Sequence, residues 1–139
     1  MIRPATQQDI DYVRANSVED TKDYPRVELT GDVVALTNNG VLYAVGGVLI
    51  LRPGLGEFWV MLTKDFKECI SSRAAVIEIS DQVNAHSALH SLVRCQAVVR
   101  ADFNAAVHMM EWLGFECEGL LRMYLPGDVD AYMYSRIEV

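Results

Sequence analysis

The spacing of apolar residues along the chain predicts alternating strands and helices. Short apolar or alternating runs bounded by Gly, Pro and Asn predict strands, and apolar residues three or four positions apart predict helices. A first helix should follow Thr6, a suitable N-cap, with Asp9 in its first turn. Residues 20–29 should form a loop or short helix, because Pro25 breaks their pattern. The pattern predicts strands over 1–4, 32–36, 41–51, 57–62, 89–99, 115–125 and 131–139, and later helices over 67–86 and 103–113.

Turn residues separate these expected elements. Asn38-Asn39-Gly40 indicates a tight hairpin turn, because Asn and Gly tolerate positive φ angles. Further turns are expected at 52–56 and 126–128, and Gly114 should close the last helix. The order of elements predicts a mixed α+β chain of the α/β type, with helices on both faces of a mixed sheet.

The composition fits one globular domain over residues 1–139. The chain is 51% hydrophobic and 22% charged, which suits a packed core. Its longest apolar stretch, residues 41–51, is too short for a membrane helix and contains Gly46 and Gly47. The first residues lack the pattern of a secretory leader, so a cytoplasmic location without membrane attachment is expected.

Charge and ligand spacing narrow the expected partners. The formal net charge of −7 argues against a basic nucleic-acid-binding face. The three cysteines show no metal-ligand spacing, and neither do His86, His90 and His108, so no metal is expected. A histidine is nevertheless suited to proton transfer, and each of the three remains a minor catalytic candidate.

Two stretches near the C-terminus carry a resemblance to a known family. Val98 to Ala106 would be a strand that delivers Asn104 to the start of a helix, and Glu111 to Gly119 contains the helix-ending Gly114-Phe115 before an acidic strand. The opening Ile2 to Thr6, with Asp9 downstream, is also similar. In this order the chain resembles the GNAT superfamily of acyl-CoA-dependent N-acetyltransferases. The resemblance implies a central mixed, mostly antiparallel sheet of about seven strands.

The resemblance also implies a binding site for acetyl-CoA. The strand 57–62 would splay from the strand 91–98 and expose backbone groups to the pantetheine arm. Backbone N–H groups of Val60, Met61 and Leu62 would stabilise the oxyanion. The pyrophosphate would bind at Lys67, Ile70, Ser71 and Ser72, although Ile70 replaces a family glycine. The alternative interpretation of Lys67 is an exposed lysine in the first turn of the expected helix. Asn104 would contact the cofactor or cap its helix.

The catalytic candidates follow the same resemblance. Glu57 would deprotonate the amine, and its alternative is a solvated carboxylate beside a turn. Many family members carry a Tyr as general acid where this chain has Met110, which has no acidic proton. His108 could replace it, as could one of the late tyrosines Tyr124, Tyr132 and Tyr134.

Two classes of function follow. The first is transfer of an acetyl group from acetyl-CoA to a primary amine on a small molecule or a protein, by direct attack. The alternative is a catalytically inactive GNAT-fold structural or interaction protein, for example a phage virion component, or a non-catalytic acyl-CoA binder. The altered loop and Met110 favour this alternative. The edge of the final strand pair could mediate a homodimer.

Overall fold

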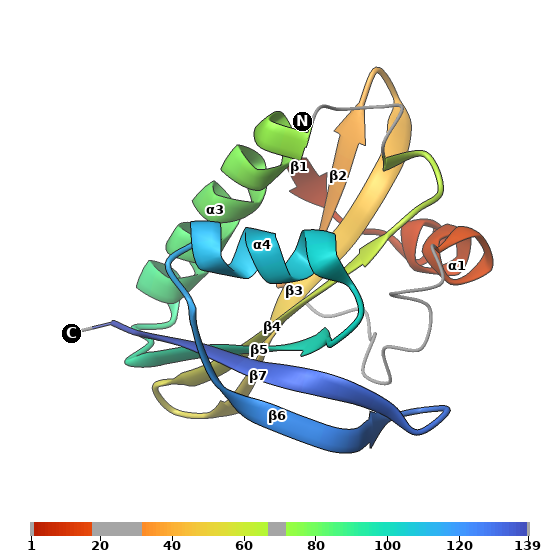
Figure 1. Ribbon diagram of the computed structural model, residues 1–139. Helices are drawn as coiled ribbons and strands as arrows, with labels where there is room; N and C mark the ends of the chain where they lie inside the picture. Colours follow the sequence, from red (N-terminus) through yellow and green to blue (C-terminus); the bar gives the residue numbers. More distant parts are fainter. Residues whose placement is uncertain (1, 18–31, 67–71, 139) are drawn as a thin grey trace. The chain divides into compact units, whose positions relative to one another are not determined.

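A computed structural model describes residues 2–17, 32–66 and 72–138 of the chain. The strands are hydrogen-bonded in the order β1-β2-β3-β4-β5-β7-β6, with β4–β5 parallel and the pairs β1–β2, β2–β3, β5–β7 and β6–β7 antiparallel. This confirms the mixed, mostly antiparallel seven-stranded sheet. The elements are β1 (Ile2–Pro4), α1 (Gln7–Asn16), β2 (Val34–Asn38), β3 (Val41–Arg52), β4 (Leu55–Leu62), α3 (Ser72–Leu89), β5 (Arg94–Arg100), α4 (Asn104–Trp112), β6 (Glu116–Leu125) and β7 (Val129–Ile137) (Figure 1).

The chain divides into two compact units. The first unit contains Met1–Val48 and Val60–Ile79, and the second contains Leu49–Trp59 and Ser80–Val139. Strands β3 and β4 and helix α3 each contribute residues to both units. The expectation of one domain over 1–139 stays a prediction. In the ranges 2–17, 32–66 and 72–138, no helix is long and apolar enough to cross a membrane.

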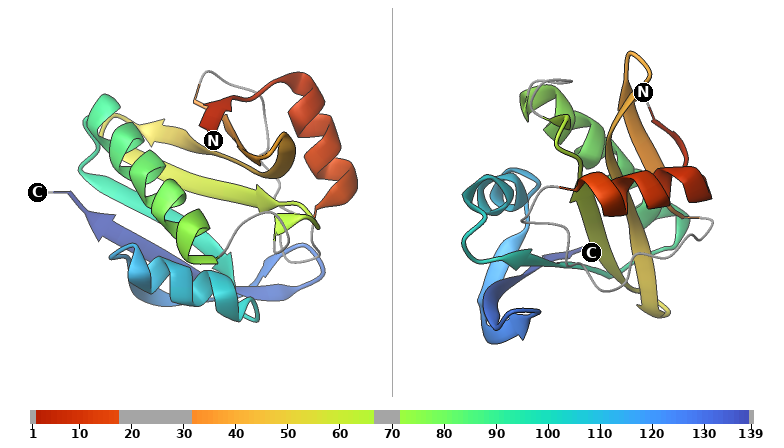
Figure 2. Two further views of the ribbon diagram at one scale, coloured as in Figure 1. Left: turned by 90° about the horizontal axis from the view of Figure 1, so that it is seen from above. Right: turned by 90° about the vertical axis from the view of Figure 1, so that its right-hand side faces the viewer.

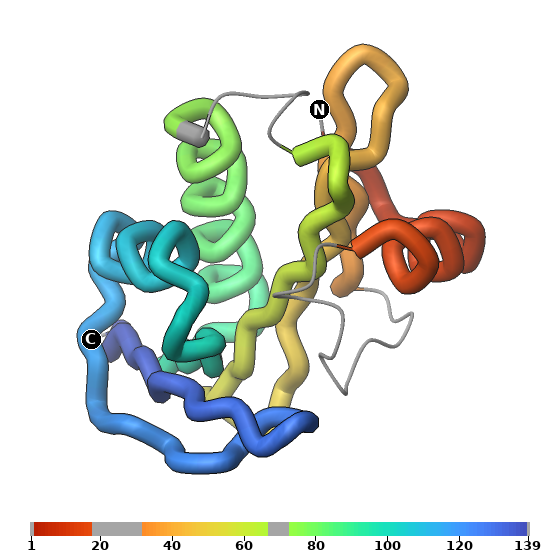
Figure 3. The backbone as a smooth tube through the Cα atoms, turned by 45° about the vertical axis from the view of Figure 1, so that its right-hand side comes forward, coloured from red at the N-terminus to blue at the C-terminus, as the bar shows by residue number. Residues whose placement is uncertain are grey.

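The first unit is built around the β2–β3 hairpin, whose two strands lie side by side in Figure 3. Asn39 and Gly40 join them with φ angles of 51° and 79°, as a type I′ turn requires, which confirms the predicted turn. Ile10 and Val13 of α1 are buried, and their three-residue spacing puts them on one face of the helix. The core of this unit also includes Ala35, Leu36, Tyr43, Ala44, Val45 and Met61.

Helix α1 begins with a capping box. The Thr6 hydroxyl accepts a hydrogen bond from the Asp9 N–H, and the Asp9 carboxylate accepts one from the Thr6 N–H. Each bond satisfies a backbone donor that the first helical turn leaves without an intrahelical acceptor. The predicted N-cap at Thr6 is therefore confirmed.

The second unit contains the ladder β4-β5-β7-β6 and helix α4, which follows β5 and contacts it (Figure 2). Helix α4 ends in a Schellman motif, in which Gly114 N–H bonds to Glu111 C=O and Phe115 N–H bonds to Met110 C=O. Gly114 has a φ of 83°, so the predicted closing glycine is confirmed. The core includes Trp59, Cys95, Ala97, Val99, Met110, Leu113, Phe115, Ala131 and Tyr134.

Several predicted boundaries were wrong. Helix α3 extends to Leu89 and not to His86, and β5 begins at Arg94, five residues after the predicted start. The apolar stretch around Leu89 and Leu92 has no periodicity that separates a helix end from a strand. Strand β2 spans residues 34–38 and not 32–36, because its register is set by pairing with β1 and β3. The central strand β4 begins at Leu55, two residues before its predicted start at Glu57.

Candidate functional site

Glu57 lies near the start of β4 and is 9% exposed. The strand starts directly after the turn at Pro53-Gly54, where Gly54 has a φ of 85°. The Gly54 carbonyl accepts hydrogen bonds from the Val93 and Arg94 N–H groups at 2.8 and 3.0 Å, which aligns β4 with β5. This parallel ladder places Glu57 opposite Gln96. Glu57 is therefore a buried carboxylate, and the solvated alternative was wrong.

The Glu57 carboxylate is oriented by a side chain that sequence reasoning missed. Gln96 Nε2 donates to Glu57 Oε1 at 3.0 Å, and Gln96 Oε1 accepts from Arg94 Nε at 3.1 Å. A guanidinium only donates and a carboxylate only accepts, so both neighbours demand the same orientation of the Gln96 amide. The Gln96 side chain is thus held at both ends, and it holds Glu57 in turn.

The hydrogen-bonded row continues across the next two strands. Arg94 donates two bonds to the Glu118 carboxylate on β6, at 2.8 and 2.6 Å, and Ser135 of β7 donates a third at 2.7 Å. We call Glu57, Gln96, Arg94, Glu118 and Ser135 the polar row. The hydrogen bonds from Arg94, and then from Ser135, lower the pKa of Glu118 to about 2. The bond to Glu118 raises the pKa of Arg94, so the pair stays charged at neutral pH.

A sequence signal for the polar row exists in β5. Its polar residues alternate with Cys95, Ala97 and Val99, which are all buried. Alternation puts Arg94 and Gln96 on the opposite face of the strand from these three residues. It therefore marks a polar face on a central strand. The alternation does not identify the hydrogen-bond partners of these polar residues, because Glu57 and Gln96 are 39 residues apart in the chain.

The residues expected to bind acetyl-CoA are described only in part. Met61 and Leu62 are buried and Val60 is half-buried at the end of β4. Lys67, Ile70 and Ser71 lie outside the described residues, and Ser72 is the first residue of α3. The β4–β5 ladder covers Leu55–Phe58 and Arg94–Ala97. The rest of β4 belongs almost entirely to the other compact unit, so the predicted splay stays a prediction.

Asn104 is the first residue of α4, and its side chain is exposed. The N-cap is Phe103, and no side-chain cap bond forms there, so the interpretation of Asn104 as the helix cap was wrong. The helix begins one residue earlier than the cap preference of Asn suggested, because the turn after β5 sets its start. The Phe103 N–H bonds to the Arg100 carbonyl at 3.0 Å in that turn. An exposed Asn104 remains accessible to a ligand.

The structure does not gather the predicted general acids into one buried site. His108 is exposed on α4, and Tyr124 is 56% exposed on the edge strand β6. Met110, at the position where many family members carry Tyr, is 5% exposed and packs in the core of the second unit. Tyr134 is also buried, and burial raises the pKa of its hydroxyl. Of Glu57, His108 and Tyr124, Glu57 is the one that belongs to the polar row.

Comparison with solved structures gives a consistent result for the fold. The ribosomal-protein-alanine N-acetyltransferase from Brucella melitensis has a TM-score of 0.75 at 17% identity, with 99% of each chain covered. A GNAT-family acetyltransferase from Bacillus anthracis has a TM-score of 0.76 at 14% identity, covering 98% of this chain and 93% of that one. The ribosomal-protein-S18-alanine N-acetyltransferase from Escherichia coli has a TM-score of 0.72 at 19% identity, covering 99% and 92%.

The chain therefore has the fold of the GNAT acetyltransferases along nearly its whole length. No protein-family model and no curated protein sequence matches it. At these identities the likeness defines the fold, whereas the chemistry has to be argued from the site.

Proposed function

We propose that the protein is an N-acetyltransferase that transfers an acetyl group from acetyl-CoA to a primary amine. The observation that carries the proposal is Glu57, a buried carboxylate on the β4–β5 pair that Gln96 orients. The GNAT fold supports it, because acetyltransferases share that fold with this chain over nearly its full length.

In the proposed reaction, Glu57 accepts a proton from the substrate ammonium, directly or through water. The free amine then forms a bond to the acetyl carbonyl carbon, which leaves the nitrogen positively charged. The nitrogen loses its second proton to water as the carbon–sulfur bond of the thioester breaks, and the amide forms. Backbone N–H groups of Val60, Met61 and Leu62 stabilise the oxyanion, and Asn104 contacts the cofactor arm. Coenzyme A leaves as a thiolate that takes a proton from water or from an exposed group such as His108 or Tyr124.

The acceptor in this proposal is a cationic amine. The chain carries a net charge of −7, which favours the approach of positively charged molecules over anionic ones. A polyamine and a protein N-terminus both offer a primary amine of this kind. Small-molecule polyamines and short peptides are therefore the first acceptors to assay.

A second candidate is a GNAT-fold protein without catalysis, which serves as a structural or interaction component or as an acyl-CoA binder. The burial of Met110 favours it. Met110 stands where many family members carry the Tyr that donates a proton, and its side chain packs in the core and has no acidic proton. The two candidates differ in an observable way, since only the first consumes acetyl-CoA.

Calorimetric titration with acetyl-CoA, followed by a turnover assay with a panel of amines, separates these candidates. We expect saturable binding near one molecule per chain, and a loss of turnover of about 100-fold or more in Glu57→Gln. Glu116→Gln is the matched control, because Glu116 is an exposed carboxylate of the same unit on β6.

The other outcomes are equally informative. Binding without turnover would support the acyl-CoA binder. An absence of binding at millimolar acetyl-CoA, with a folded protein, would reject the transferase in favour of a structural role. Turnover that survives in Glu57→Gln would reject Glu57 as the base.

A further inference from the structure

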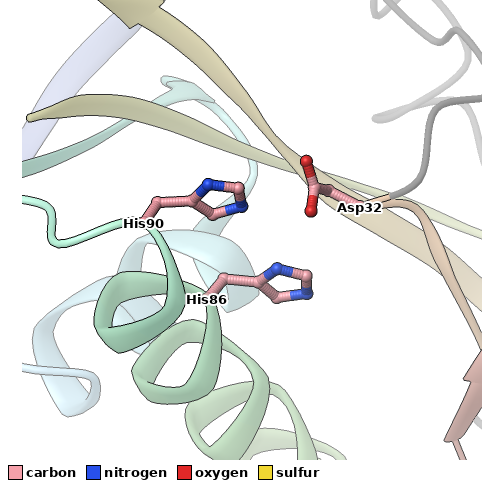
Figure 4. A group of neighbouring side chains, drawn as sticks. All are labelled: Asp32, His86 and His90. Carbon is pink, nitrogen blue, oxygen red and sulfur yellow. The ribbon is translucent and has the colours of Figure 1, made fainter. Parts of the chain in front are cut away.

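Two histidines lie one helical turn apart at the C-terminal end of α3. His86 belongs to the last turn of the helix, and the His90 N–H donates to the His86 carbonyl at 3.1 Å. This bond has the i to i−4 spacing of an α-helix, so both side chains project from the same face. Their ring centroids are 6.4 Å apart and the ring planes differ by 5° (Figure 4).

The backbone that carries the pair is held in place by a Schellman motif. The Ser91 N–H bonds to the Ala88 carbonyl at 3.2 Å, and the Leu92 N–H bonds to the Ser87 carbonyl at 3.0 Å. Ser91 has a φ of 49°, and both Ser87 and Leu92 are buried. The helix end is therefore anchored on both sides of His90. A ligand that bridges the two imidazoles would have little backbone left to order.

We propose that His86 and His90 form a binding site for a divalent transition-metal ion such as Zn²⁺ or Ni²⁺. Imidazole nitrogen is a preferred ligand of these ions, whereas Mg²⁺ and Ca²⁺ prefer oxygen. A ligand nitrogen of His86 lies within 4.8 Å of one of His90. Two nitrogens on a tetrahedral zinc are about 3.3 Å apart, given a Zn–N bond of about 2.0–2.1 Å. Two histidines four residues apart on one helix face are a known arrangement for binding a single zinc ion.

Two further features favour a cation at this place. The C-terminal end of a helix carries a partial negative charge from its last carbonyl groups. Both histidines are half-buried, so each ring is partly shielded from water. Two protein nitrogens leave positions on the metal for water or other oxygen donors. The sequence did not indicate that His86 and His90 lie one helical turn apart, because the predicted helix ended at His86 and left His90 outside it.

The test is a titration of the full chain with ZnCl₂ and, separately, NiCl₂, followed by calorimetry and by the shift in Tm. We expect one high-affinity ion per chain, and at least a tenfold loss of affinity in both His86→Ala and His90→Ala. His108→Ala is the matched control, because His108 is an exposed histidine on α4 and should leave the affinity unchanged. Cys117→Ser is a second control, because an exposed thiol can also bind zinc.

A metal-free Tm for each variant shows whether it is folded. If His86→Ala does not fold, His90→Ala decides the question, since His90 lies at the end of the helix. The proposal is rejected if wild-type protein binds neither metal at millimolar concentration, if His90→Ala binds as tightly as wild type, or if the controls lose as much affinity. An equal response to MgCl₂ would also reject it.

Discussion

The Asp9→Asn substitution tests the capping box at the start of α1. The Asp9 carboxylate accepts two hydrogen bonds from the Arg3 guanidinium, at 2.6 and 2.9 Å, and two from Thr6, at 2.8 and 3.0 Å. Asp9 is only 7% exposed. The amide of Asn keeps the shape of the side chain but removes the charge, so it weakens the bonds to Arg3 most.

The magnitude follows from the pKa of Asp9, which the Arg3 bonds and then the Thr6 bonds lower from 3.8 to about 2. At about 1.4 kcal/mol per pKa unit, this shift sets an upper limit of about 2–3 kcal/mol. The Arg3 side chain is 43% exposed, so solvent screens part of the interaction. We expect Asp9→Asn to lower the free energy of unfolding by about 1–2 kcal/mol at pH 7.

The pH dependence has a definite sign. The folded-state pKa of Asp9 lies below its unfolded value, so the stabilisation is complete above the unfolded pKa and disappears as the pH falls through the folded one. The difference between wild type and Asp9→Asn should begin to shrink below about pH 4 and be about half as large at pH 3.

Urea unfolding followed by circular dichroism at pH 7, 5, 4 and 3 measures this difference. Asp11→Asn is the matched control, because Asp11 is an exposed carboxylate of the same helix that accepts a hydrogen bond from the neutral side chain of Gln7. It should change the stability by less than about 0.5 kcal/mol. Equal effects of the two substitutions, or a difference for Asp9→Asn that is constant from pH 7 to pH 3, would refute the reasoning.

Two further predictions concern backbone geometry and thiol reactivity. Gly54→Ala should destabilise the protein by about 1–3 kcal/mol in urea unfolding, because φ is 85° and a Cβ would lie 2.7 Å from the Val93 side chain. Gly40→Ala, with a φ of 79° and open space around it, should cost less, and an equal cost would contradict this. In a Cys69→Ser background, a thiol reagent should modify exposed Cys117 quickly and buried Cys95 slowly. Burial raises the pKa of the Cys95 thiol, so less of the reactive thiolate forms there. Equal rates for both thiols would contradict their assigned burial.

Local chemistry in the sequence determined several parts of this protein. Thr6 and Asp9 start α1, Asn39-Gly40 makes the hairpin turn, and Gly114 ends α4, as predicted. Each of these features depends on a few neighbouring residues, whose φ preferences and short side-chain bonds act without the rest of the chain. The order of strands and helices followed from apolar spacing, and it was sufficient to indicate the fold.

Tertiary structure decided the contacts between distant residues. The polar row depends on the parallel pairing of β4 with β5, which brings Glu57 next to Gln96 across 39 positions of the chain. The proximity of His86 and His90 depends on where α3 ends, and an apolar stretch that suits a helix or a strand could not fix that point. Periodicity records which face of an element is buried, whereas the partner on that face and the last residue of the element are set by packing and by pairing with other segments.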